Sequence, residues 1–401
     1  MKNRLIIKNG KVIFPDRTEE NLSILCENGK IIEILKSEDT ALDGNETVID
    51  AGNKYVAPGF IDIHTHGGGG HDFMDGTVEA YLGAAETHAK HGTTALVPTT
   101  LTSTSEELLQ TFSVYKDAVK QNKKGAKFLG LHLEGPYFAY NQRGAQDPKY
   151  LRNPEPEEYN RILEETDDIV RWSLAPELPG AFAFGRVLTS KNILTSIAHS
   201  DAIYEEVLEA YHAGFSHVTH LYSAMSTVTR RNAFRYAGVL ESAYLIDDMT
   251  VEIIADGVHL PKPLLQFVYK FKGPDKTALC TDSMRGAGMP DGESILGSLG
   301  KGQKVIIEDG VAKLPDRTAF AGSVATTDRL VRTMMNIAEI PLTDAVKMMT
   351  LTPARIMHID QYKGSIGKGK DADLVIFDDN INVSFTILEG NVIYASRHNR
   401  K

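Results

Sequence analysis

The sequence predicts an α/β protein, a (β/α)8 barrel flanked by a small β-domain to which both ends of the chain contribute. Short apolar runs alternate with helical patterns through most of the chain, a texture that is typical of repeated βα units and a parallel sheet. The two ends consist instead of short apolar runs joined by turn residues. A length of 401 residues is sufficient for a closed barrel and a second unit. We therefore expect a barrel of residues 57–359, and a β-domain formed by residues 1–56 and 360–401.

The composition restricts the classes of protein to consider. The chain has 43 basic and 53 acidic residues and a net charge of -10, so no generally basic surface invites nucleic acid or an anionic membrane. Cys26 and Cys280 are its two cysteines and lie far apart in sequence, which predicts no disulfide framework and favours a reducing cytoplasm. The N-terminal apolar runs are too short for a signal peptide, and no stretch approaches the roughly 20 apolar residues that span a bilayer. We expect a cytoplasmic protein.

The two ends of the chain share one texture. Asn9-Gly10 and Asn28-Gly29 stand between apolar runs of residues 1–56, and Asn-Gly pairs in this position are hairpin signals. The C-terminal end repeats the pattern, with apolar runs at 373–377, 383–388 and 392–394. We expect the two ends to pair as one sheet.

The helices predicted for the middle of the chain carry start and stop signals. Residues 105–120 follow a Ser/Thr/Glu composition that is typical of a capping box. Residues 201–213 are followed by Gly214, a suitable C-terminal cap. The other predicted helices are 77–91, 261–271 and 326–340. The predicted strands between them are 60–63, 93–97, 128–133, 193–197, 217–219, 251–254 and 277–280.

Titratable side chains follow the predicted strands at the point where each strand ends. Side chains alternate along a strand, so His64 and His66 point to the same face. The residues in corresponding positions after the other strands are Glu134, His199, His220, Asp256, His259 and Asp282. Active sites of barrels lie at the carboxyl ends of the strands, so we expect these groups to share one rim. Because a buried carboxylate or imidazole is costly unless it is paired, the set indicates a metal site.

Each of these residues also has a structural interpretation when it is taken alone. A His-x-His pair in a strand is more often structural than catalytic, and His199 or His220 alone suits a hydrogen-bonded core histidine. Glu134 before Gly-Pro suits a turn, and Asp282 before Ser283 suits the N-cap of a helix. The metal interpretation therefore depends on the set as a whole.

The remaining histidines are weaker candidates. His132 lies on the same face of the predicted strand as Glu134, which makes it a candidate to orient the metal ligands without binding the metal itself. His217 precedes His220 by three residues and suits a structural role. Three histidines fall on or near predicted helix ends, and they are His88, His91 and His212. A favourable helix dipole or contact with solvent explains a histidine in such a position.

Segments spread over nearly the whole chain carry a family resemblance. They are APGFIDIHTHG, GLHLEGPY, IAHSDA, VTHLYSAM, IADGVHL, CTDSMRGAGMPDGE, FAGSVATTDRLVR, TLTPARI and GSIGKGKDADLVIFD. The chain resembles the amidohydrolase superfamily and, within it, the N-acetylglucosamine-6-phosphate deacetylases. HLEGP together with AGMPDGE is the most specific part, whereas the last two segments are general to amidohydrolases with a β-sandwich beside the barrel. The resemblance implies that the small domain is such a β-sandwich.

The resemblance also implies a set of metal ligands. His64, His66, Glu134 and Asp282 would hold one divalent cation, and Glu134 with His199 and His220 would hold or share a second. Imidazole and carboxylate ligands suit zinc, iron, cobalt and manganese alike. A bound cation lowers the pKa of water from 15.7 to about 7, and the resemblance implies that Asp282 accepts the water proton and returns it to the amine.

A set of substrate-binding residues follows from the same resemblance. It comprises Ala145, Gln146, Ser223, Ala224, Arg231, Asp256, Gly257, His259, Phe320, Ala321 and Gly322. His259 would contact a sugar hydroxyl, and residues 320–322 would close over the substrate. Arg231 matches by spacing the phosphate-binding arginine that the neighbouring subunit donates in dimers, so we expect a homodimer. An arginine fork suits phosphate, although solvated surface charge is the alternative interpretation of this residue.

The expected activity is metal-dependent hydrolysis of the acetamide of N-acetyl-D-glucosamine 6-phosphate to glucosamine 6-phosphate and acetate, in amino-sugar catabolism. Two departures from the family pattern bear on the substrate. Ser223 stands where relatives usually have Asn, and Gln146 stands where they usually have His; Gln can donate a hydrogen bond but cannot become cationic. The galactosamine epimer, an unphosphorylated sugar and another amide such as an N-acyl amino acid are the alternatives. A non-catalytic binding protein is more remote, because the chain keeps every ligand.

Overall fold

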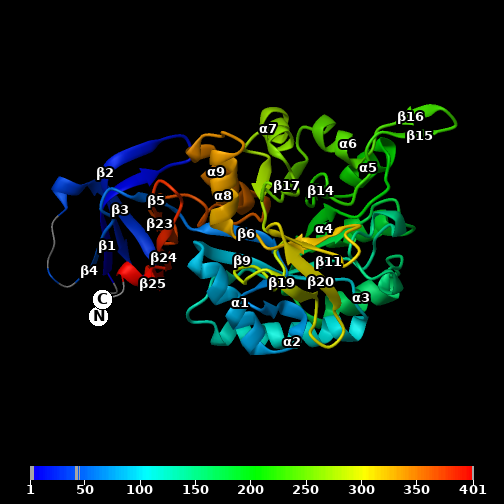
Figure 1. Cartoon of the computed structure of the whole chain (residues 1–401), viewed down its shortest axis with the longest axis horizontal. Helices are drawn as coiled ribbons and strands as arrows, with labels where there is room; N and C mark the ends of the chain where they lie inside the picture. The colour runs from blue at the N-terminus through cyan, green and yellow to red at the C-terminus, as the bar shows by residue number, and fades with distance from the viewer. Residues whose placement is uncertain (1–3, 41–43, 45, 400–401) are drawn as a thin grey trace.

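The structure of the chain is a computed structural model that describes residues 4–40, 44 and 46–399. A barrel surrounded by helices occupies one side of the molecule, and a small sheet that contains both ends of the described chain occupies the other (Figure 1). The predicted (β/α)8 barrel with a small β-domain is confirmed. The domain limits at residues 56 and 360 stay a prediction.

The barrel strands are parallel and follow one another around the sheet in sequence order. In that order they are β6 (Phe60–Thr65), β9 (Thr93–Thr100), β11 (Leu131–Glu134), β12 (Ile169–Leu174), β13 (Leu194–Ile197), β14 (Phe215–Val218), β17 (Thr250–Ile253) and β18 (Thr277–Leu279). The short strand β10 (Lys127–Phe128) also pairs with β9. A parallel bridge between Thr65 and Ser283 brings the two ends of the sheet together. The carboxyl ends of the strands therefore form one rim.

The helices cover the outside of the barrel. They are α1 (Val78–Lys90), α2 (Ser105–Gln121), α3 (Pro156–Glu165), α4 (Ala181–Ser190), α5 (Tyr204–His212), α6 (Val239–Leu245), α7 (Lys262–Phe271), α8 (Thr327–Asn336), α9 (Leu342–Met349) and α10 (Leu351–Ile356). Single 3-10 turns occur at Ser37–Asp39, Phe73–Asp75, Tyr140–Gln142, Pro148–Tyr150 and Arg397–Asn399. No helix of the described residues is long and apolar enough to cross a membrane.

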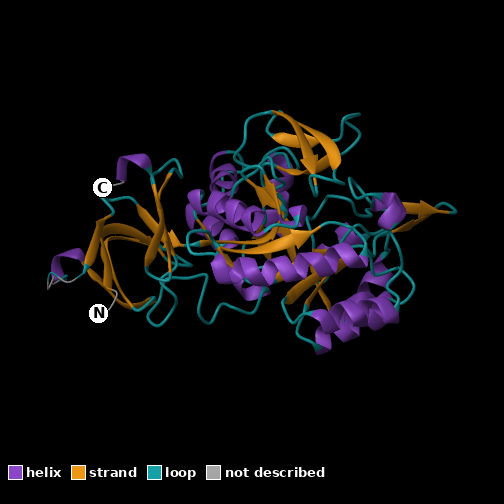
Figure 2. Cartoon of the chain, turned by 90° about the horizontal axis from the view of Figure 1, so that it is seen from below, coloured by secondary structure: helices purple, strands orange, loops and turns teal. Residues whose placement is uncertain are grey.

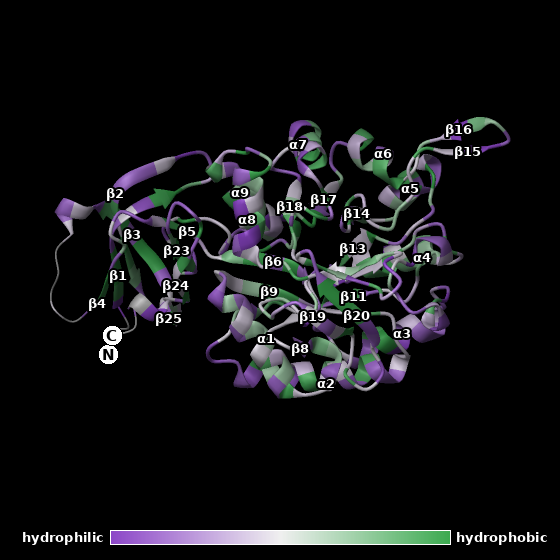
Figure 3. Ribbon diagram, in the orientation of Figure 1, coloured by the Kyte–Doolittle hydropathy of each residue, from purple (hydrophilic) through white to green (hydrophobic). Residues whose placement is uncertain are grey.

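Helix α2 illustrates how local sequence sets these elements. The Thr104 hydroxyl accepts from the Glu107 N–H, and the Glu107 carboxylate accepts from the Thr104 N–H, so the predicted capping box is present. The helix carries both purple and green residues in Figure 3. The buried side chains Leu108, Phe112 and Tyr115 recur at helical spacing, and they hold one face against the barrel.

The small sheet joins the two ends of the chain. Its strands are β1 (Arg4–Ile13), β2 (Thr18–Glu27), β3 (Lys30–Lys36), β4 (Thr47–Asp50), β5 (Tyr55–Pro58), β23 (Leu374–Phe377), β24 (Val383–Leu388) and β25 (Asn391–Ala395). Antiparallel pairing of β5 with β23 makes them one sheet. Asn28-Gly29 forms the predicted turn, with positive φ at both residues. Asn9-Gly10 does not form a turn. It lies inside β1, where the register with β2 shifts, because a β-bulge accommodates an extra residue in this strand.

Several elements were not predicted from the sequence. They include β12, α3, α4, α6, α9, α10, and a four-stranded sheet of β19 (Gly292–Leu296), β20 (Gln303–Glu308), β21 (Val311–Lys313) and β22 (Phe320–Ser323). This sheet lies beside α8, whose Arg329 side chain donates to the Gly310 carbonyl of the β20–β21 turn at 2.9 Å. Two short ribbons complete the fold, β7 (Gly67–Gly68) with β8 (His71–Asp72), and β15 (Thr229–Arg231) with β16 (Phe234–Tyr236). The four-stranded sheet matters because its residues line the cavity described below.

Candidate metal centre

The structure brings together six of the eight titratable side chains that the sequence places at strand ends, all except Asp256 and His259. His64 lies in β6 and His66 directly follows that strand, while Glu134 is the last residue of β11. The other three follow β13, β14 and β18, and they are His199, His220 and Asp282. All six are buried. Their convergence follows from the barrel, because the carboxyl ends of parallel strands meet on one rim.

Glu134 lies at the centre of the group. Its Oε1 is 3.1 Å from His220 Nε2 and 3.5 Å from His199 Nε2. The same oxygen is 3.5 Å from His64 Nε2, whereas Oε2 is 3.4 Å from His66 Nε2. Two groups close enough to hold a cation therefore share this carboxylate, one with His64 and His66 and the other with His199 and His220.

Asp282 completes the first of these groups. Its Oδ1 is 3.1 Å from His66 Nε2 and 3.4 Å from His64 Nε2. The backbone N–H of Asp282 donates to the His64 carbonyl at 2.9 Å, which fixes the end of β18 against β6. One carboxylate oxygen of Asp282 thus faces the same two imidazole nitrogens as Glu134.

The backbone is left-handed at three of the six positions. The φ angles are 47° at His199, 29° at His220 and 46° at Asp282. Such a conformation costs a non-glycine residue on the order of 1–3 kcal/mol, and it persists where the surrounding structure holds it for a purpose. Each of these residues follows a strand, and its own side chain lines the cavity at the mouth of the barrel.

Hydrogen bonds orient three of the imidazoles so that Nε2 faces the centre. His64 Nδ1–H donates to the Glu252 carboxylate at 2.7 Å, and His199 Nδ1–H donates to the Gln142 carbonyl at 2.7 Å. His66 Nδ1–H donates to the Thr99 carbonyl at 3.2 Å. This is the arrangement that metal-binding histidines adopt, because the outer hydrogen bond sets the tautomer and leaves the inner lone pair for the cation.

The charges of the group also fit a cation. Burial opposes ionisation of Glu134, but neighbouring histidines, His64 foremost, hold its pKa well below the ordinary value. Burial acts to lower the pKa of His66, yet Asp282 and Glu134 raise it to about 10, so a bound cation would take the place of a proton that these carboxylates attract. The buried Nε2 of His64 has no hydrogen-bond partner among the described residues. Two ionised carboxylates facing imidazole nitrogens form a donor set suited to a divalent cation.

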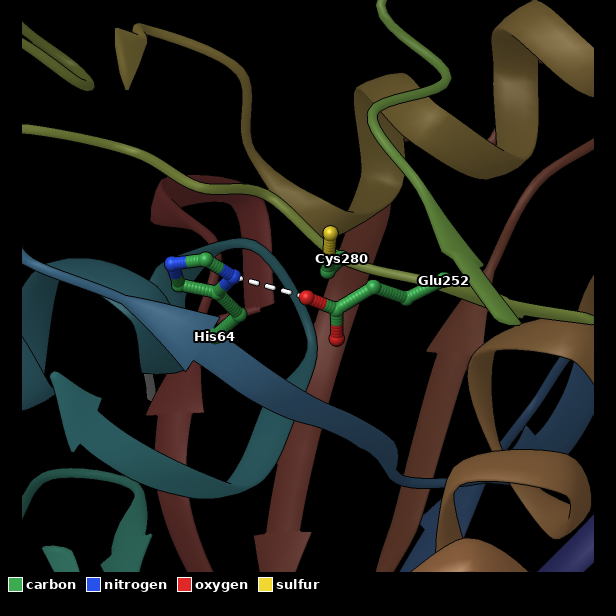
Figure 4. Close-up of side chains that lie close together, drawn as sticks. All are labelled: His64, Glu252 and Cys280. Atoms are coloured by element: carbon green, nitrogen blue, oxygen red, sulfur yellow. Dashed lines mark hydrogen bonds and ion pairs between the residues drawn. The ribbon is translucent and has the colours of Figure 1, made fainter. Parts of the chain in front are cut away.

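A second cluster behind His64 has a different role. His64, Glu252 and Cys280 lie close together, and the carboxylate of Glu252 points at the His64 ring (Figure 4). Arg171 already neutralises this carboxylate, with contacts of 2.6 and 2.9 Å to its two oxygens. Burial raises the pKa of the Cys280 thiol well above its ordinary value, so it stays neutral. A cation here would be repelled by the guanidinium, and we assign Glu252 to holding His64.

Two further histidines support the centre, and the sequence interpretation of one was wrong. His132 packs its ring edge against His64 with centroids 4.8 Å apart, and it bonds Ser173 and Thr99 rather than Glu134. His88 is neither solvated nor explained by a helix end: it is fully buried, and its Nε2 contacts the Gly67 carbonyl at 3.0 Å. Its ring holds the glycine turn after His66, a role without a signal in the sequence.

His88 gives a testable pH dependence. Burial lowers the pKa of His88 from 6.5 to about 4, so the unfolded chain takes up this proton first as the pH falls. The contribution to stability is therefore complete above about pH 6.5 and is lost towards pH 4, by on the order of 3 kcal/mol. The non-titrating variant His88→Gln should show a flatter decline in the free energy of unfolding. Parallel curves for the two proteins between pH 7 and 4 would contradict this.

A cavity of about 380 Å³ opens above the centre, which is within the range of small-molecule sites. Its wall includes seven of the predicted substrate residues, which are Ala145, Gln146, Ser223, Ala224, His259, Phe320 and Gly322. Sequence reasoning missed other wall residues, namely Leu101, Asn141, Gln142, Gly144, Tyr222, Ile254, Leu296 and Ala319. These carry no catalytic signature, and two of them belong to the unpredicted four-stranded sheet region.

Four of the predicted substrate residues lie outside this wall. Asp256 is behind His259, where its Oδ2 accepts from His259 Nδ1–H at 2.7 Å. Gly257 forms the turn between them, with φ of 82°, and Ala321 is fully buried next to Phe320. Arg231 is on the exposed β15–β16 ribbon, which projects away from the barrel in Figures 1 and 2.

The cavity wall contains no lysine or arginine of the described chain. The basic residues of the ribbon are Arg230, Arg231 and Arg235, and Phe234 beside its turn is 72% exposed. The ribbon therefore presents cations and an apolar ring on the outside of the chain.

Known proteins were found that are similar to most of this chain. Residues 55–393 match the amidohydrolase family. The chain is similar to the N-acetylglucosamine-6-phosphate deacetylases of Lysinibacillus sphaericus, at 33% identity over 97% of both chains, and Bacillus subtilis (strain 168), at 32% over 99% of both. An N-acetylgalactosamine-6-phosphate deacetylase of Escherichia coli O157:H7 is 29% identical, over 86% of this chain and 89% of that one. The crystal structure of the N-acetylglucosamine-6-phosphate deacetylase of Pasteurella multocida is similar with a TM-score of 0.90 and 29% identity, over 98% of this chain and all of that one.

Proposed function

Because the chain belongs to the amidohydrolase family, we propose that it hydrolyses the acetamide of N-acetyl-D-glucosamine 6-phosphate to glucosamine 6-phosphate and acetate, in the catabolism of amino sugars. The observation that carries the proposal is the position of Glu134 between two sets of imidazoles, with Asp282 beside one of them. The buried, free thiols of Cys26 and Cys280 agree with action in the cytoplasm.

The residues of the centre fit one or two divalent cations. His64, His66, Glu134 and Asp282 would hold one, and Glu134, His199 and His220 would hold the other. Zinc, iron, cobalt and manganese all suit these ligands. Such a cation, when bound, polarises the amide carbonyl and lowers the pKa of a bound water to about 7.

Asp282 has the properties of the proton carrier. Burial opposes its ionisation, but His64 and His66 lower the pKa of its carboxyl, so it is a carboxylate near neutral pH. It also lines the cavity, so its carboxylate borders the space that the substrate amide would occupy. We assign it to accepting the proton of the water and returning it to the amine, which would otherwise be a poor leaving group.

The sugar would be held above the centre by the wall of the cavity. His259, with Nδ1 tied to Asp256, offers Nε2 to a sugar hydroxyl, and its ring lies 4.6 Å from that of Phe320. Ala145, Gln146, Ser223, Ala224 and Gly322 line the remainder. Asp256, Gly257 and Ala321 would act through the residues that they position.

The phosphate needs a cation that the cavity wall does not supply. The ribbon with Arg231 projects from its own subunit, and the exposed ring of Phe234 suits a contact with a second copy. We therefore assign Arg231 to the phosphate site of the partner in a homodimer, since a guanidinium fork matches phosphate oxygens.

Replacing Arg231 tests this assignment. We expect Arg231→Ala to lower kcat/KM for the 6-phosphate about 10-fold to 100-fold, because a hydrogen bond to a charged group contributes about 1.5–3 kcal/mol. The value for N-acetyl-D-glucosamine itself should not change. Arg230→Ala is the matched control, since neighbouring side chains in a strand point to opposite faces. Equal losses on both substrates, or the same loss in the control, would contradict the assignment.

The activity is tested by measuring acetate and free amine released with zinc, iron(II), cobalt or manganese. The panel comprises N-acetylglucosamine 6-phosphate, its galactosamine epimer, the two unphosphorylated sugars and an N-acyl amino acid. We expect the glucosamine phosphate to react fastest. Ser223 in the cavity wall, a departure from the family pattern, and the similarity to the N-acetylgalactosamine-6-phosphate deacetylase favour the epimer as the second candidate. No release from any sugar phosphate with any of the metals would overturn the proposal.

A further inference from the structure

Both polar atoms of the Gln146 side-chain amide form hydrogen bonds. Its Oε1 accepts from the Thr102 backbone N–H at 3.0 Å and from the Thr102 hydroxyl at 2.9 Å. Its Nε2 donates to Glu134 Oε2 at 2.9 Å. A peptide N–H is only a donor, so the group that faces it must be the carbonyl oxygen, and the amide has one possible orientation. The side chain is buried, with the residue 7% exposed.

This amide contacts the carboxylate that both groups of imidazoles share. Glu134 Oε1 faces His64, His199 and His220, so Oε2 is the oxygen left for Gln146 and His66. Each carboxylate oxygen can accept two hydrogen bonds. One N–H from Gln146 occupies one position on Oε2 and leaves the other directed to the side of His66.

We propose that Gln146 is a positioning residue for Glu134, and that it sets the affinity of the centre for its cation. Free rotation of Glu134 would move both oxygens away from their imidazoles, and the Thr102–Gln146 pair prevents this. The amide is also a neutral donor. It supports the carboxylate without adding a positive charge that would compete with a cation, as a protonated histidine at this position would.

The backbone around Gln146 is held independently of its side chain. The Gln146 N–H donates to the Arg143 carbonyl at 2.9 Å, and the side chain of Gln303 donates to the Ala145 carbonyl at 2.7 Å. Loss of the Gln146 amide should therefore leave the loop in place and release only Glu134. Gln303 provides a matched control, because it anchors the same loop but makes no contact with a predicted ligand.

The inference rests on the proposed metal centre, and metal binding tests it apart from turnover. Gln146→Met keeps the length of the side chain and removes its donors. We expect it to raise the dissociation constant for Zn²⁺, measured against a chromogenic chelator, about 10-fold to 100-fold. The visible spectrum of the Co²⁺-loaded variant should also change. Thr102→Val, which removes one of the two bonds to Gln146 and retains the backbone donor, should act in the same direction but less strongly. Gln303→Met should bind Zn²⁺ as the unmodified chain does.

The inference would be overturned, and the proposed function would remain, if Gln146→Met and Thr102→Val had the same Zn²⁺ affinity and Co²⁺ spectrum as the unmodified chain. A rise in KM without a change in affinity would then assign Gln146 to the substrate only. An unmodified chain that binds neither cation would overturn the proposed function together with this inference. Thr102→Val also provides the test if Gln146→Met fails to fold, because its change lies one hydrogen bond further from the ligand.

Discussion

Asp282→Asn should lower kcat about 100-fold to 10,000-fold, the range that general acid and base groups contribute, while the chain remains folded. The amide keeps the shape of the carboxylate but cannot take the proton from water. Asp282 also faces His64 and His66 at 3.4 and 3.1 Å, so a lost cation could mimic a lost base. The measurement is therefore kcat at saturating metal, with the bound metal determined in the same sample.

Asp256→Asn is the matched control for this variant. Asp256 lies on the same rim and contacts His259 rather than the centre, so its replacement should act mainly on KM through the orientation of that ring. If Asp282→Asn retained near-normal kcat, Asp282 would lose the proton-transfer role. If both variants lost kcat equally, the effect would not be specific to the carboxylate beside the histidines.

The ligand set could be predicted because strand ends are visible in sequence. An apolar run followed by a polar side chain marks the point where a strand leaves the barrel, and His64, Glu134, His220 and Asp282 all occupy such points. The barrel then brings them together, although more than two hundred residues separate the first from the last. No knowledge of side-chain contacts is needed for this step.

The support behind the ligands could not be predicted in the same way. Strand β12 contains Arg171 inside the barrel, and a charged residue in a strand suggests exposure unless its partner is known. That partner, Glu252, lies on β17 and is itself charged, so the sequence suggests exposure for both residues although they are buried against each other. The interpretation of His88 as a solvated residue at a helix end was wrong for a related reason. Its contact with Gly67 depends on how α1 packs against the glycine turn after His66.

The cavity wall was predicted only where it carries polar or family-specific residues. Leu296 and Ala319 belong to the region of the four-stranded sheet, and an apolar side chain by itself carries no signal for a substrate site. Asn9-Gly10 shows a related limit. The dipeptide favours a turn, but pairing of β1 with β2, β4 and β5 keeps the chain extended through it.

The buried pair of Arg171 and Glu252 should have the largest effect on stability. Both residues are fully buried and joined by two contacts of 2.9 Å or less. In Glu252→Leu the guanidinium would remain in the core without its partner, which costs about 3–5 kcal/mol. We expect chemical unfolding of the metal-free variant to show this loss. Zn²⁺ affinity should fall about 10-fold to 100-fold as well, because His64 Nδ1–H would lose its acceptor.

The double variant Arg171→Met with Glu252→Leu separates these two effects. Removing both charges leaves no unpaired ion, and apolar replacement of a buried pair is often neutral or stabilising. Stability should therefore recover while Zn²⁺ affinity stays low, since no carboxylate returns to His64. Recovery of both would show that Glu252 acts on the metal centre only through the fold. Recovery of neither would show that Arg171 has a role besides neutralising Glu252, for which its hydrogen bonds to the Ile63 carbonyl and the Thr219 hydroxyl are the structural candidates.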